Sequence, residues 1–111
     1  MARTIETAEE RHELPAVQPV GTLQQVLAAL ADPVRLEMVR RMARTGEPVA
    51  CGDLYDTINK STASHHFKIL REAGLTERVV LGGQTHQLLR AREVEEALPG
   101  VLSSVVAAAR G

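Results

Sequence analysis

The side chains best suited to bind another molecule lie on one face of an amphipathic helix that is predicted to start at Ser61 and to stop at Gly74. Successive residues of a helix are about 100° apart, which places Phe67 and Leu70 on one side. The opposite side presents short hydrogen-bonding groups, an imidazole and an ammonium, at Ser61, Thr62, His65 and Lys68. Groups of this kind bind base edges in the major groove and the phosphates of a duplex. The face therefore favours a nucleic acid as the partner.

The same residues have simpler roles that compete with this interpretation. Ser61 can serve only as the cap of its helix, and His66, at the edge of the apolar side, can be a packed residue. His65 and Lys68 can be solvated surface side chains. The neighbouring elements favour the first interpretation, because a short helix is predicted over 53–58 and a hairpin follows the amphipathic helix. Together these elements have the outline of a winged helix-turn-helix.

Caps, glycines and apolar spacing predict the remaining elements. Asp32 followed by Pro33 is a strong helix start, and Gly46 is a natural stop. Gly82 and Gly83 predict a tight turn between two strands. The predicted helices are 22–31, 33–44, 53–58, 61–73, 91–98 and 101–109, the predicted strands are 79–81 and 86–89, and residues 47–51 are expected to be extended. We expect a mainly α fold with a small β-hairpin.

The size and charge of the chain bound its possible roles. Its 111 residues fit one domain with a thin core, expected over 22–111 and preceded by an N-terminal arm over 1–21. The net charge is −1, but ten Lys and Arg stand against six Asp and Glu between residues 35 and 92. This excess lies around the predicted DNA-facing helix, although scatter in a small protein would also produce it. One cysteine and no apolar run of bilayer length lead us to expect a cytoplasmic protein without a membrane partner.

The first and last helices of the predicted domain carry more apolar side chains than one small core can bury. These residues are Leu23, Val26, Leu27, Leu30, Val101, Leu102, Val105 and Val106. Excess apolar helix surface predicts a partner helix. We therefore expect a homodimer through the first and last helices, presenting two DNA-facing helices to half-sites about one duplex turn apart.

Two separated motifs resemble a known family. The run Ala29-Leu30-Ala31-Asp32-Pro33-Val34-Arg35-Leu36 is similar to the signature opening of ArsR/SmtB-type bacterial repressors, and the run from Ser61 to Leu75 is similar to their recognition helix. The resemblance implies a homodimeric winged helix-turn-helix that binds operator DNA and represses transcription. By position, it implies that DNA is contacted by Ser61, Thr62, Ser64, His65, Lys68, Arg78 and the wing residue Gln84.

The chain departs from the family's best-known sensing patterns. Metal-sensing members often carry a Cys-Val-Cys-Asp-Leu run, where this chain has Ala50-Cys51-Gly52-Asp53-Leu54. The other common site uses Asp and His pairs on the last helix, but residues 91–111 contain neither His nor Cys. A non-standard site for a transition metal such as nickel, zinc or cobalt stays open at His12 with Glu9 or Glu13, or at His86. The metal ligands and the effector are therefore unknown at this point.

Two other functional classes compete with DNA binding. An enzyme is the weaker one, because the chain has no recognisable nucleophile–base motif, no Gly-rich phosphate loop and no paired carboxylates with a cleft signature. The stronger alternative is a winged-helix protein-protein interaction module without DNA binding, since this fold can also dock proteins. A protein co-regulator is kept open as a further partner.

Overall fold

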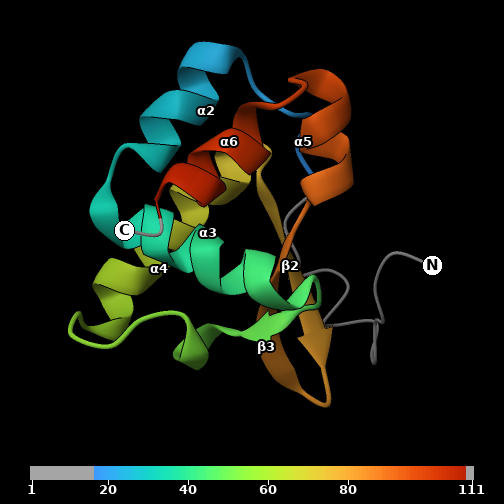
Figure 1. The fold of residues 1–111 in the computed structure, drawn as a ribbon. Coiled ribbons are helices and arrows are strands. Elements are labelled where there is room, and N and C mark those ends of the chain that lie inside the picture. The colour runs from blue at the N-terminus through green and yellow to red at the C-terminus, as the bar shows by residue number, and fades with distance from the viewer. Residues whose placement is uncertain (1–16, 110–111) are drawn as a thin grey trace.

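The computed structural model describes residues 17–109, in which helices pack together and a β-hairpin extends away from them (Figure 1). In chain order the elements are α2 (Leu23–Leu30), α3 (Pro33–Thr45), β1 (Val49–Ala50), the 3-10 turn η1 (Cys51–Asp53), α4 (Lys60–Glu72), β2 (Thr76–Leu81), β3 (Gln84–Leu89), α5 (Ala91–Ala97) and α6 (Val101–Ala108). This order confirms the expected mainly α fold of the winged helix-turn-helix type. The boundary between an arm and a domain at residue 22 stays a prediction, because residues 1–16 lie outside the described part.

The predicted Asp32 cap forms on α3, and α2 has a capping box that was not predicted. Thr22 and Gln25 make a reciprocal capping box, with backbone-to-side-chain distances of 2.7 and 3.2 Å. Asp32 Oδ1 accepts hydrogen bonds from the backbone nitrogens of Val34 at 2.8 Å and Arg35 at 3.2 Å. Burial opposes ionisation of Asp32, but these bonds and the nearby Arg35 charge outweigh it and lower the pKa of its carboxyl. α3 is thus firmly started by its own sequence.

The predicted DNA-facing helix, α4, begins earlier than expected, and its cap is Asn59 rather than Ser61. The Asn59 backbone is extended, with φ −83° and ψ 168°, and its Oδ1 accepts a hydrogen bond from the Thr62 nitrogen at 2.8 Å. Asn and Ser are both good N-caps, so the sequence alone does not decide which of the two starts the helix. Because Asn59 takes this role, the Ser61 hydroxyl is exposed in the first turn and available to a partner.

No α-helix forms over residues 53–58, where one was predicted. A segment this short, with two Asp and a Thr, has little helical stability of its own. Tertiary contacts hold it as η1 and a loop instead. Leu54 is buried in the core, and the ring of Tyr55 lies edge-on to Phe67 with 6.3 Å between the ring centroids.

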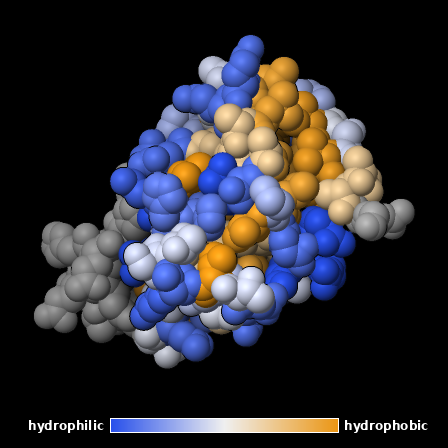
Figure 2. Space-filling model, turned by 90° about the vertical axis from the view of Figure 1, so that its left-hand side faces the viewer, coloured by the Kyte–Doolittle hydropathy of each residue, from blue (hydrophilic) through white to orange (hydrophobic). Residues whose placement is uncertain are grey.

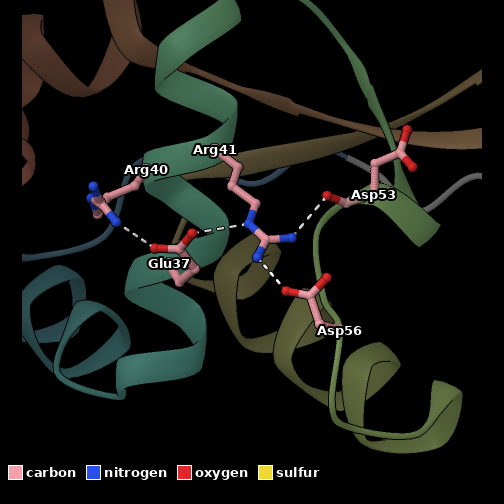
Figure 3. A network of polar contacts seen from close by, with 5 residues as sticks. All are labelled: Glu37, Arg40, Arg41, Asp53 and Asp56. Carbon is pink, nitrogen blue, oxygen red and sulfur yellow. Dashed lines mark hydrogen bonds and ion pairs between the residues drawn. The ribbon is translucent and has the colours of Figure 1, made fainter.

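Arg41 on α3 ties this loop to the body of the protein (Figure 3). Its guanidinium binds Glu37 Oε2 at 2.9 Å, the Asp53 carbonyl oxygen at 3.1 Å and the Asp56 carboxylate. Arg40 binds the other oxygen of Glu37 at 2.5 Å. Hydrogen bonds from Arg41 lower the pKa of both Glu37 and Asp56. Charge pairing thus replaces the missing helix as the support of the segment that precedes α4.

The hairpin belongs to a three-stranded antiparallel sheet in the order β1-β3-β2. The expected extended stretch supplies β1, which pairs with β3 through Val49 opposite Gln87. β2 pairs with β3 from Thr76 opposite Leu89 to Leu81 opposite Gln84, so both strands are longer than predicted. Gly82 and Gly83 have φ of 57° and 76° and form the tip, as a tight turn with two left-handed residues requires.

Residues 17–21 run across the end of α4 and fix where β2 begins. The Gly21 nitrogen donates to the Ala73 carbonyl at 2.9 Å, and Arg90 Nη1 bridges the carbonyls of Gln18 and Gly74 at 2.5 and 2.9 Å. Gly74 has φ +78°, and a Cβ there would lie 2.3 Å from the Pro19 carbonyl oxygen. Only glycine therefore allows α4 to end and the chain to turn into β2 at this point.

Candidate nucleic-acid interface

The exposed face of α4 is the one predicted from helical spacing. Ala63, Phe67 and Leu70 are 1%, 5% and 0% exposed, which confirms the apolar side. The five predicted contact residues on this helix are all exposed: Ser61, Thr62, Ser64, His65 and Lys68. In the first turn, short side chains surround the N-terminal end of the helix, where free backbone amides favour anions. The face can therefore approach a polyanion closely.

Lys68, on this face, makes a weak internal contact. Lys68 Nζ lies 3.8 Å from Glu72 Oε2, and both side chains are more than 60% exposed, at 64% and 61%. Such a pair contributes little in water. Lys68 is thus free to exchange the carboxylate for a phosphate.

A cationic hollow of about 570 Å³ lies between α4 and the sheet. Its lining includes Lys60 and Ser64 from α4, Arg71 near the end of α4, and Arg78 and Gln84 from the hairpin. Three of the predicted contact residues, from two separate elements, therefore meet at one place. The remaining predicted residues lie on α4 outside this lining.

Arg71 lines the same hollow, although it was not among the predicted contact residues. It is half-buried, and its pKa is lowered first by burial and then by the neighbouring charge of Arg78. Within residues 17–109 neither guanidinium forms a hydrogen bond or an ion pair with a carboxylate. The signal in the sequence is the helical spacing of Arg71, seven residues after Ser64, but only the folded hairpin brings Arg78 beside it. The hollow therefore holds two neighbouring guanidiniums, neither of which is hydrogen-bonded to a carboxylate of the described residues.

Cys51 and Gln87 form the inner wall of the same hollow. Gln87 is 1% exposed and its Nε2 lies 3.7 Å from the Cys51 sulfur. Burial raises the pKa of the Cys51 thiol, so the neutral thiol is favoured, as expected for a structural cysteine.

The metal-binding options from the sequence receive no support within the described part. No three His, Cys, Asp or Glu side chains of residues 17–109 lie close enough together to hold a metal ion. The ring of His86 instead contacts its own strand, with Nδ1 2.9 Å from the Gln84 carbonyl oxygen. His12, Glu9 and Glu13 lie outside the described residues.

Arg35 joins the end of α2 to the buried side of α4. Its Nε donates to the Ala29 carbonyl at 2.7 Å, and its Nη1 lies 3.1 Å from Nδ1 of His66. Because arginine can only donate, Nδ1 of His66 accepts this bond and carries no proton. His66 is 9% exposed, which confirms it as a packed edge residue. The motif around Asp32 and Arg35 thus has an architectural role.

Fewer of the predicted dimer-interface residues are exposed than the sequence suggested. Val26, Leu30 and Leu102 are 0%, 4% and 5% exposed, because they pack into the core of the chain itself. Leu23 and Leu27 are 41% and 43% exposed, and the partly buried valines of α6 are Val101, Val105 and Val106. Figure 2 shows a band of apolar atoms along the upper right of a face that is otherwise largely hydrophilic.

Comparison with known proteins agrees with this geometry. A helix-turn-helix domain model matches residues 30–79. The chain is 37% identical over 83 residues to the uncharacterized HTH-type transcriptional regulator YceK of Bacillus subtilis (strain 168), a match that covers 73% of this chain and 83% of that protein.

Two solved structures share the fold. An ArsR-like transcriptional regulator from Rhodococcus sp. RHA1 is 24% identical, with a TM-score of 0.58, and the match covers 67% of this chain and 70% of that one. The transcriptional repressor BigR from Xylella fastidiosa is 22% identical, with a TM-score of 0.60, over 80% of this chain and 87% of that one.

An exposed polar helix beside a glycine-tipped hairpin, on this fold, defines a DNA-binding regulator of transcription. The chain belongs to the family of helix-turn-helix transcriptional regulators, and its fold is that of the ArsR-like structures. The family evidence supports this regulatory role and gives no support to catalysis. A search of residues 17–109 finds no helix with the length and hydropathy that a membrane span requires.

Proposed function

We propose that this regulator is a repressor that binds operator DNA with α4 in the major groove and the hairpin tip against the flanking backbone. The observation that carries the proposal is the meeting of Ser64, Arg71, Arg78 and Gln84 around one hollow. Hydroxyl and imidazole groups on α4 would contact base edges, and the two guanidiniums would take a phosphate. Lys68, on the exposed side of α4, would take another.

The proposal includes a two-fold homodimer formed by α2 and α6. Leu23 and Leu27 are large apolar side chains on the exposed side of α2, and a second copy would remove them from water. The sedimentation mass should be that of a dimer at micromolar concentration. Replacing both leucines by Glu should give a monomer, whereas Gln24→Glu, which changes a neighbouring exposed position of α2, should leave the mass unchanged.

The decisive experiment is selection of bound sites from random duplex DNA with the purified protein. A repressor of this geometry should select two half-sites about one duplex turn apart. His65→Ala should relax the preference at one base position by about 1–3 kcal/mol, whereas Lys68→Ala should weaken all sites alike and reduce the salt dependence. Recovery of no sequence above background at low salt would overturn the proposal.

A further inference from the structure

A second hollow, none of whose lining residues belongs to α4, has no role in the proposed DNA contacts. Its volume is about 750 Å³, and it opens between the C-terminal half of α3, the start of α5 and one side of α6. In Figure 1 α6 lies beside both α5 and α3. The volume is within the range of sites that hold small organic molecules, about 300–1,000 Å³.

The floor of this hollow is apolar. Leu89, Leu102 and Val106 line it together with Ala43 and Ala107. Leu102 is 5% exposed and is part of the core, so the floor is fixed by packing within the chain. An apolar group placed here would be removed from water at little cost in reorganisation of the protein.

The rim of the hollow is cationic. Arg40, Arg44 and Arg92 line it with a single acidic residue, Glu95. Arg40 is bound to Glu37, and Glu95 Oε2 accepts a hydrogen bond from the Gly100 nitrogen at 2.8 Å. Arg44 and Arg92 form no hydrogen bond or ion pair within residues 17–109. Two guanidiniums are therefore available above an apolar floor.

We propose that this hollow binds an amphipathic organic anion, a carboxylate or sulfonate carried on an apolar body. The body would lie on Leu89, Leu102 and Val106, and the anionic group would be held by Arg44 and Arg92. Both parts are needed, because an inorganic anion would leave the floor exposed and a neutral apolar molecule would leave the guanidiniums without a partner.

The position of the hollow connects it to DNA binding, a step that rests on the proposed function. α3 packs against both α6 and α4. A ligand between α3 and α6 would therefore bias the placement of the helix that supports α4. Binding of the anion should change the affinity for DNA by the same factor by which DNA changes the affinity for the anion.

Calorimetric titration of the full chain with octanoate, and separately with 1-octanol, tests the site. Octanoate should bind with one molecule per chain and about tenfold more tightly than 1-octanol. Arg44→Gln/Arg92→Gln should remove this preference, and the charge-conserving control Arg44→Lys/Arg92→Lys should keep most of it. Ala107→Trp, which fills the hollow, should abolish binding of both compounds.

Three results would overturn the proposal: no octanoate binding at millimolar concentration, equal binding of the two compounds, or an unchanged preference in Arg44→Gln/Arg92→Gln. A change of sedimentation mass in Ala107→Trp would overturn the proposal as well. Such a change would show that a second copy of the chain, and not a small anion, occupies the hollow. DNA affinity is measured separately, with and without octanoate. Octanoate binding to a protein that selects no DNA would contradict the proposed function and leave the anion site standing.

Discussion

Arg41 and Arg71 are partly buried arginines on neighbouring helices with opposite surroundings. Hydrogen bonds to Asp56 and Glu37 raise the pKa of Arg41, whereas burial and the charge of Arg78 lower that of Arg71. The first cation is neutralised inside the chain and fixes the loop before α4. The second has no such partner within residues 17–109 and faces a hollow next to the exposed reading face. The paired arginine supports the structure, whereas Arg71 is the one to which the proposed function assigns a phosphate.

The largest effect is expected at Gly74, which turns the chain between Arg71 and Arg78. Gly74→Ala places a Cβ 2.3 Å from the Pro19 carbonyl oxygen, in addition to the unfavourable φ of +78°. We expect a loss of about 3 kcal/mol or more in the free energy of unfolding, measured by urea denaturation, and a separation of the two guanidiniums that weakens DNA binding.

Gly46→Ala is the matched control for that change. Gly46 has a similar φ of +68°, but a Cβ there would meet nothing within 4 Å. It should cost only the strain of the left-handed backbone, about 1 kcal/mol. Equal losses in the two variants would show that the close approach of residues 17–21 to α4 is not what requires glycine at position 74.

The next effect concerns the unpaired cations. Arg71→Gln/Arg78→Gln should weaken DNA binding about 10- to 100-fold at low salt and lower the slope of log affinity against log salt by about two. The stability should stay the same or rise, because two adjacent like charges are removed. Fluorescence anisotropy with a labelled duplex measures both affinity and slope. An unchanged slope would mean that the hollow takes no phosphate.

The smallest effect concerns the paired cation. Arg41→Gln should lower the free energy of unfolding by about 1 kcal/mol, because the contacts of Arg41 are partly exposed to solvent. DNA affinity should stay close to that of the parent under conditions where the variant is folded. A loss of DNA affinity larger than that of Arg71→Gln/Arg78→Gln would reverse the assignment of the two arginines.

At low pH the difference in stability between Arg41→Gln and the parent should disappear. Arg41 lowers the pKa of Glu37 and Asp56 in the folded state below their ordinary values of 4.5 and 3.8. Their contribution to stability is thus present above those values and is lost as the pH falls through the lower folded pKa values. Urea midpoints of the two proteins measured at falling pH should converge. Midpoints that stay apart in acid would contradict charge pairing as the source.

The sequence predicted well those elements whose ends are set by local chemistry. Asp32 with Pro33, Gly46 and the Gly82-Gly83 turn fixed their elements as expected, because each acts within a few residues of itself. The exposed face of α4 was also predicted, since helical spacing alone decides it.

The errors arose where distant residues decide the outcome. Residues 53–58 are held by Arg41 from α3 rather than by helical propensity. Arg71 was not among the predicted contact residues, because only the folded hairpin brings Arg78 beside it. Val26, Leu30 and Leu102 were predicted at the surface of a dimer because a sequence does not show how much apolar area the chain's own core consumes.

The hydrogen bonds of the Arg35 guanidinium, to α2 and to α4, have a mechanical consequence. One guanidinium contacts both the last turn of α2 and the imidazole of His66 on α4, so a movement of α2 would be transmitted to α4 through side-chain hydrogen bonds. In a two-fold pair, a small tilt of α2 against its counterpart would change the span between the two DNA-binding helices. A signal received between subunits would then reach the duplex as a mismatch of spacing, without any segment having to unfold.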